Sequence, residues 1–142
     1  MKPLHKFLDH TADVFFVAKA DTLPALFNEC ALAVEETMVE VSKVKVVEKV
    51  KILGESAKVE SLLFDFLDEL LFFKDYRQLV FSKFDIDIKE GNGKYSLVCQ
   101  AQGEKIDFSR HEPKVDVKAI TMHEFKVEQV KEGWKAQVLI DI

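Results

Sequence analysis

The sequence has no excess of basic residues, and this lack limits how it could bind nucleic acid. Of its 142 residues, 20 are Lys or Arg and 25 are Asp or Glu, so the formal net charge is −5 at pH 7. Proteins that grip RNA or DNA over a whole face neutralise many phosphates with clustered Lys and Arg. We therefore expect any contact with RNA to be local and weak, or to be made through a partner protein.

Cysteines and long apolar runs are also scarce. Cys30 and Cys99 stand among apolar residues, without the CxxC spacing that would indicate a zinc or redox site. This pattern is typical of reduced core thiols in a cytoplasmic protein. No apolar run approaches the ~20 residues of a membrane-spanning helix, and the first residues lack the apolar core of a signal peptide. We predict a cytoplasmic protein without a membrane partner.

The composition is that of a globular domain. Hydrophobic residues make up 48% of the chain and charged residues 32%, a balance that excludes a disordered chain. There is no internal repeat, low-complexity tract or linker. A chain of this length buries about two-thirds of the surface of its unfolded state. We predict a single domain over residues 1–142.

The hydrophobic pattern predicts an α+β fold, with two amphipathic helices packed on a mainly antiparallel β-sheet system. We expect the helices to cover one face of this system. Runs rich in β-branched residues or alternating apolar residues predict the strands, and the glycines at 91 and 93 predict a tight turn. The expected strands lie at 4–8, 14–20, 41–53, 84–88, 95–101, 115–130 and 135–140.

Two apolar stripes at 3-4 spacing predict the helices. The first runs from Leu23 to Met38, after a capping Asp21-Thr22, and the second from Val59 to Leu71, after a capping Ser56. We expect both stripes to form the core. Acidic residues of these helices that lie outside the stripes, such as Glu35, are expected on solvated faces.

The densest group of chemically capable side chains is Asp9-His10-Thr11-Ala12-Asp13. Such residues either satisfy the backbone of a turn or contribute to a site. At the other end of the chain, Asp141 and the main-chain carboxylate of Ile142 add further oxygen donors. If the two ends meet in space, Asp13, Asp141 and Ile142 could hold one divalent cation.

A second polar cluster, residues 103–113, has the composition of a loop. Within it, Arg110 and His111 could bind a phosphate or a partner's carboxylate. They could equally pair with acidic neighbours in the same cluster, such as Glu104 or Asp107. Both interpretations stay open at this point.

His123 follows Thr121 by two residues in a predicted strand, so we expect both side chains on one face. A single strand histidine is usually structural. Here it could instead support the turn that carries Asp13.

Five motifs, in order along the whole chain, resemble those of the archease family. They are Asp9-His10-Thr11-Ala12-Asp13, Phe66-Leu67-Asp68-Glu69-Leu70-Leu71, Gly103-Glu104 with Arg110-His111, Val117-Lys118-Ala119-Ile120-Thr121 with His123, and Asp141-Ile142. Archeases are small cytosolic proteins that assist the GTP-dependent RNA ligase of tRNA splicing. They promote guanylylation of that ligase and let it turn over repeatedly.

The resemblance also implies a site. The family's cation ligands map onto Asp13, Asp141 and Ile142. The remaining polar residues of the motifs would support these ligands or contact the partner; they are Asp9, His10, Arg110, His111 and His123. Ligands that are all oxygen favour hard ions, Ca²⁺ first and then Mg²⁺ or Mn²⁺, whereas the nearby His10 leaves Zn²⁺ open.

The leading hypothesis is therefore a non-catalytic activator of an RNA ligase. The alternative is a metal-dependent hydrolase or nuclease, with Asp13 and Asp141 as ligands and His10 or His123 as the base. The sequence has no nucleophile constellation and no phosphate-binding glycine loop, so this alternative ranks second. A general RNA-binding module ranks last, because most of the 12 phenylalanines lie at core spacing.

Overall fold

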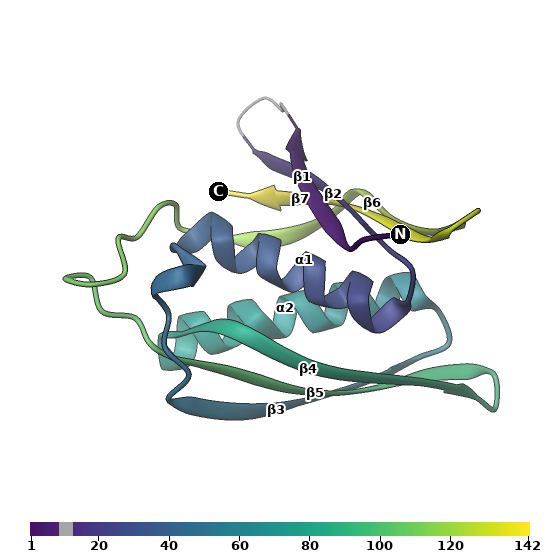
Figure 1. Ribbon diagram of the computed structural model, residues 1–142, viewed down its shortest axis with the longest axis horizontal. Helices are drawn as coiled ribbons and strands as arrows, with labels where there is room; N and C mark the ends of the chain where they lie inside the picture. The colour runs from purple at the N-terminus through teal and green to yellow at the C-terminus, as the bar shows by residue number, and fades with distance from the viewer. Residues whose placement is uncertain (9–12) are drawn as a thin grey trace.

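The computed structural model describes residues 1–8 and 13–142. Within these ranges it has seven strands, two α-helices and one 3-10 turn (Figure 1). In chain order they are β1 (Leu4–Leu8), β2 (Val14–Ala20), α1 (Leu23–Met38), η1 (Val41–Lys43), β3 (Glu48–Ser56), α2 (Val59–Arg77), β4 (Leu79–Gly91), β5 (Lys94–Lys105), β6 (Ala119–Val130) and β7 (Gly133–Asp141).

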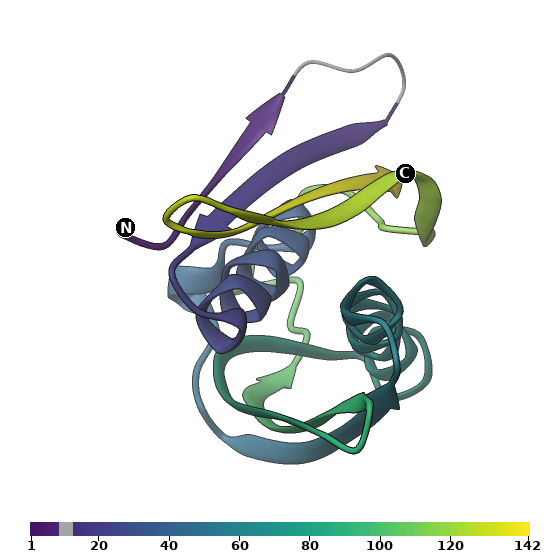
Figure 2. The ribbon, with the colours of Figure 1, turned by 90° about the vertical axis from the view of Figure 1, so that its right-hand side faces the viewer.

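The strands form two antiparallel sheets, and the helices lie between them. One sheet has the order β1-β2-β7-β6 and the other the order β3-β5-β4. Helix α1 packs on β2 and β4, and α2 packs on β6 and β3, so each helix contacts both sheets. Figure 1 and Figure 2 show the resulting three layers. The predicted α+β class is confirmed, but the helices do not cover one face of a single sheet system.

The apolar surface of α1 explains this difference. Its predicted stripe is buried from Leu26 to Met38, and so are Ala33 on one side of the stripe and Glu35 on the other. A helix with so wide a buried surface can be covered only by two layers. Its N-terminus is as predicted: Thr22 is the N-cap, and its hydroxyl accepts a hydrogen bond from the Ala25 N–H at 3.2 Å.

Helix α2 is amphipathic, and its predicted stripe forms one side of the core. Ser56 is not its N-cap, because Ser56 still pairs with Tyr95 as the last residue of β3. The helix begins three residues later, at Val59, and ends at Arg77; its C-cap, Gln78, takes the left-handed conformation with φ 55°.

The strand predicted from Val41 begins seven residues later, at Glu48. Residues 41–43 form a 3-10 turn, closed by hydrogen bonds from the Lys43 N–H to the Glu40 carbonyl and from the Val44 N–H to the Val41 carbonyl, each 3.0 Å. The valines in this stretch favour extended backbone, but a strand also needs a partner. In the pairing with β5, Glu48 is the first partnered residue of β3, opposite Gly103.

The hairpin between β4 and β5 turns at Asn92 and Gly93, which have φ values of 55° and 75°, as the Gly-Asn-Gly sequence predicted. Strand β5 then continues to Lys105, so the first residues of the predicted loop belong to the sheet. Gly103 is required there. A Cβ atom at this position would collide with the Val80 carbonyl oxygen in β4.

The core contains both cysteines, which are free and buried, as predicted. Burial raises the pKa of each thiol, so both stay protonated near neutral pH. In the part of the chain that the structure describes, no helix is long and apolar enough to cross a membrane.

One acidic side chain lies inside the core. Glu35 was predicted on a solvated face, but it has no exposed surface. Its Oε1 atom accepts a hydrogen bond from the Phe81 N–H of β4 at 2.8 Å, and Oε2 has no hydrogen-bond partner among the described residues. Burial raises the pKa of Glu35 from 4.5 to about 8. The side chain is therefore largely protonated at neutral pH.

We predict that Glu35 makes the protein less stable as the pH rises. The folded pKa of Glu35, about 8, lies above the ordinary value of 4.5. Its contribution to the free energy of unfolding is therefore full below pH 4.5 and is lost as the pH rises through 8. The slope should reach about 1.4 kcal/mol per pH unit. Glu35→Gln should remove this slope, measured by urea unfolding between pH 5 and 8.5. Glu36→Gln, a half-exposed neighbour, should keep it. Equal slopes in wild type and Glu35→Gln would contradict the assignment.

Candidate functional site

The two ends of the chain that carry the predicted ligands meet in one sheet. Strands β2 and β7 are antiparallel neighbours, and Val14 pairs with Ile140. Asp13 immediately precedes this pair and Asp141 immediately follows it, so continuing the register by one residue places them opposite each other. Cα atoms of such a pair lie about 4.5–5.5 Å apart in a regular ladder.

Alternation places both aspartates on the same face. Ile140 points into the core and is fully buried, and Asp141, the next residue, is exposed. Cross-strand neighbours share a face, so Asp13 also projects away from the core. The Lys118 N–H donates a hydrogen bond to the Asp141 carbonyl at 2.9 Å, and Ala119 of β6 pairs with Asp141. The end of β7 is thus held by β6 and the residue before it on one side, and by β2 on the other.

These residues fit a hard cation better than a soft one. Two aspartates and the carboxylate of Ile142 supply only oxygen atoms, the ligands that Ca²⁺ and Mg²⁺ prefer. Within residues 1–8 and 13–142, no group of three or more His, Cys, Asp and Glu side chains is arranged to hold a metal. A site here would therefore need an oxygen atom of the Ile142 main chain in addition to the two aspartates. Asp9 and His10 lie outside the described residues.

His123 lies in a large bulge of β6. Thr121 pairs with Leu139, and the next paired residue, Lys126, is opposite Gln137, so 122–125 face Val138 alone. Glu124 has φ 56°, and the Gln137 amide donates a hydrogen bond to its carbonyl at 2.9 Å. The alternation that placed Thr121 and His123 on one face does not extend across this bulge. His123 is exposed.

Arg110 and His111 form a compact cluster with Glu104, the residue of β5 that organises the following loop. The Arg110 guanidinium donates two hydrogen bonds to the Glu104 carboxylate, at 2.8 and 2.6 Å. The Lys45 N–H donates a third to Oε2, at 2.6 Å. His111 Nε2 lies 2.9 Å from the same oxygen. One carboxylate thus ties together β5, the loop and the segment before β3.

The hydrogen bonds assign the tautomer of His111. Its Nδ1 atom accepts a hydrogen bond from the Asp107 N–H at 2.7 Å, so Nε2 carries the proton and donates it to Glu104. His111 has no exposed surface, whereas 36% of the Arg110 side chain is exposed. Of the two residues that could have met a partner, only Arg110 reaches the surface.

The Glu104 carboxylate is strongly stabilised in its charged form. Hydrogen bonds from Arg110, and then those from Lys45 and His111, lower its pKa from 4.5 to about 2, although burial opposes the shift. A fully hydrogen-bonded, nearly buried ion pair of this kind is a structural element, and losing one partner leaves the others unsatisfied.

Sequence reasoning missed two charged residues with structural roles. Lys74 of α2 crosses to the loop before β6, and its ammonium donates hydrogen bonds to Asp116 Oδ1 at 2.9 Å and to the Val117 carbonyl at 2.6 Å. No sequence signal links these positions. Glu35 did have a signal, because it continues the spacing Phe27, Ala31, Glu35 along the buried face of α1.

Fold and site together define a small α+β protein, with two helices between two antiparallel sheets and acidic residues where β2 and β7 meet. The chain belongs to the archease family: the family model described as "Archease protein family (MTH1598/TM1083)" matches residues 5–142. It is 43% identical over 135 residues to Protein archease of Pyrococcus furiosus, covering 94% of this chain and 95% of the relative. Protein archease of Methanosarcina barkeri is 37% identical over 139 residues, covering 97% and 95%.

Two solved structures share the fold. The solution structure of protein 1598 from Methanobacterium thermoautotrophicum has a TM-score of 0.87 and 37% identity, covering 97% of this chain and 98% of that one. A crystal structure from Thermotoga maritima, of an archease described as a possible chaperone, has a TM-score of 0.63 over 96% of both chains. At 18% identity this second structure supports the fold alone.

We predict that Glu104→Gln lowers the free energy of unfolding at pH 7 by about 1–3 kcal/mol, because the ion pair with Arg110 is lost while its other donors stay buried. The folded pKa of about 2 lies below the ordinary 4.5, so the wild-type advantage is full above pH 4.5 and is lost as the pH falls through 2. Urea unfolding at pH 7 and pH 3 measures both effects. Glu55→Gln, which breaks an exposed pair with Lys94, should change little. Equal losses in the two variants would show that the cluster is not structural.

Proposed function

We propose that this protein is a non-catalytic cofactor of a GTP-dependent tRNA-splicing RNA ligase, promoting guanylylation and repeated turnover of the ligase. The observation that carries the proposal is the pairing of Val14 with Ile140, which brings Asp13 beside Asp141 on an outward face. Membership of the archease family supports it.

In this proposal a divalent cation, Ca²⁺ first, binds Asp13, Asp141 and the main-chain carboxylate of Ile142. When bound, such an ion supplies positive charge that can neutralise phosphates or carboxylates at a protein contact. The chain's own contribution is rigid placement. The Lys118 N–H holds the Asp141 backbone at 2.9 Å, and pairing with β2 and β6 on either side fixes the strand that presents the ligands.

Charge argues for an activator that works through the ligase and not through the RNA. The chain carries a net charge of −5, so it would be repelled by a phosphate backbone but attracted to the basic channel of an RNA-binding enzyme. We propose that RNA is contacted indirectly or weakly, and that the protein acts in the cytoplasm.

The metal site is tested by thermal unfolding. Carboxylates brought together without a cation repel each other, so a bound divalent ion should stabilise the fold, by about 2.7 kcal/mol when the free ion is a hundredfold above its dissociation constant. Asp13→Asn, Asp141→Asn and deletion of Ile142 should each remove most of the calcium-induced rise in melting temperature. Asp87→Asn, an exposed aspartate of β4 whose carboxylate lies 4.0 Å from Lys89, should keep it. If calcium, magnesium, manganese and zinc all leave the wild-type melting temperature unchanged, the ends of β2 and β7 form no metal site.

The function is tested by ligation with substoichiometric purified RNA ligase. Adding the wild-type protein should raise the number of turnovers per ligase severalfold. The three metal-site variants should lose this gain, and Asp87→Asn should retain it. Incubated alone with RNA, GTP or phosphate esters, the protein should leave them unchanged. Metal-dependent hydrolysis by the protein alone, lost in Asp13→Asn, would establish the hydrolase alternative instead.

A further inference from the structure

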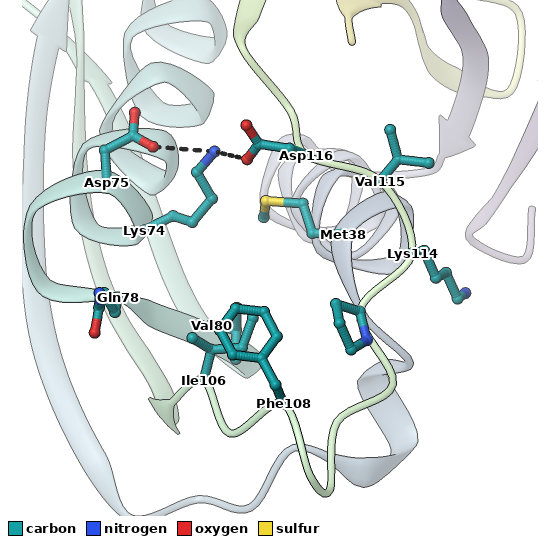
Figure 3. A pocket seen from close by; sticks show the side chains of 11 residues that line it. Met38, Lys74, Asp75, Gln78, Val80, Ile106, Phe108, Lys114, Val115 and Asp116 are labelled. Atoms are coloured by element: carbon teal, nitrogen blue, oxygen red, sulfur yellow. Dashed lines mark hydrogen bonds and ion pairs between the residues drawn. The ribbon is translucent and has the colours of Figure 1, made fainter.

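A pocket of about 360 Å³ opens between the C-terminal ends of the two helices and the segment 106–116. Figure 3 shows its lining side chains. Helix α1 contributes Met38, β4 contributes Val80, and the segment after β5 contributes Ile106, Phe108 and Val115. These side chains make its wall largely apolar. None of the proposed metal ligands lines this pocket.

Main-chain hydrogen bonds hold this pocket in shape. The Ile106 N–H donates to the Gln78 carbonyl at the end of α2, and the Lys114 N–H donates to the Met38 carbonyl at the end of α1, each at 2.8 Å. The segment is therefore anchored to both helices, on either side of the opening. A preformed cavity binds without the entropic cost of ordering a loop.

Two of its apolar residues remain strongly exposed. Phe108 is 71% exposed and Val115 40% exposed. Their apolar surface stands at the opening, next to the cavity wall. Exposed apolar residues around a cavity mark a binding site more often than scattered single residues do.

The charges at the rim favour a cationic occupant. The Lys74 ammonium is already shared between Asp75 at 3.0 Å, Asp116 at 2.9 Å and the Val117 carbonyl at 2.6 Å. An ammonium group has three N–H donors, so Lys74 has none left for an anionic ligand.

The second lysine of the rim is also engaged. Lys114 pairs with Glu36 at 2.9 Å. Both ammonium groups of the lining are therefore engaged in ion pairs, whereas the Asp116 side chain is 81% exposed. Asp116 thus offers a carboxylate at the surface beside the pocket.

We propose that this pocket binds a segment of a partner protein in which a large apolar side chain stands next to an Arg or Lys. The apolar side chain would fill the space between Met38, Val80 and Phe108, and the cation would pair with Asp116. A volume of about 360 Å³ lies at the low end of ligand pockets and suits one large side chain better than a nucleotide cofactor. The proposal stands apart from the metal site and does not depend on the ligase as partner.

The test uses the methyl signals of the three methionines, labelled with ¹³C, in the 142-residue protein. Met38 lines the pocket, whereas Met1 and Met122 are exposed elsewhere and serve as internal references. The probes are two blocked dipeptides, N-acetyl-Phe-Arg-amide and N-acetyl-Phe-Glu-amide. The Met38 signal should shift saturably with the first, and the second should bind about fivefold more weakly, the size of one exposed ion pair.

Two variants assign the binding to these residues. Phe108→Ala removes an exposed wall of the pocket and should weaken both probes. Asp116→Asn should bring the two dissociation constants together, whereas Asp87→Asn should leave them apart. The proposal would be overturned if neither probe shifted the Met38 signal, or if both probes bound the wild type equally. It would also be overturned if the Met38 signal shifted with protein concentration alone, because the occupant would then be a second copy of the chain.

Discussion

The pairing of β2 with β7 is the contact on which the rest of the molecule depends. These two strands are the inner pair of the four-stranded sheet, flanked by β1 on one side and β6 on the other. Their core-facing residues, Phe16 and Ala18 with Val138 and Ala136, are fully buried and form the surface on which α1 packs. The same register brings Asp13 and Asp141 together. A slip of one residue would exchange the buried and exposed faces, so the core itself fixes the position of the proposed ligands.

The segment between β5 and β6 is the second organised part of the molecule, although it has no regular secondary structure. Glu104 holds its start through Arg110 and His111, and Lys74 holds its end through Asp116 and Val117. Directly after Val117, the Lys118 N–H bonds to Asp141. The segment that forms the wall of the pocket is therefore joined to the end of β7 by this hydrogen bond.

Several elements could be predicted from the sequence because their causes are local. The Thr22 cap, the two apolar stripes and the Asn92-Gly93 turn depend on residues close together in the chain, and all were predicted correctly. Predictions failed where a distant segment decided the outcome. The valines before Glu48 lie outside the ladder between β3 and β5, and Gly103 to Lys105 extend β5 because they pair with β4. Glu35 is buried because β4 packs against it.

The same distinction between local and long-range causes applies to the candidate site. The sequence by itself determined which residues have the chemistry for a cation, namely the aspartates and carboxylate at the two ends of the chain, and it left the roles of Arg110 and His111 open between a partner and Glu104. Only the tertiary structure decided that Asp13 lies beside Asp141, that His111 is buried inside the Glu104 cluster, and that His123 lies in a bulge of β6. The reason is physical: side-chain chemistry belongs to each residue, but the distance between residues 128 positions apart depends on which strands pair.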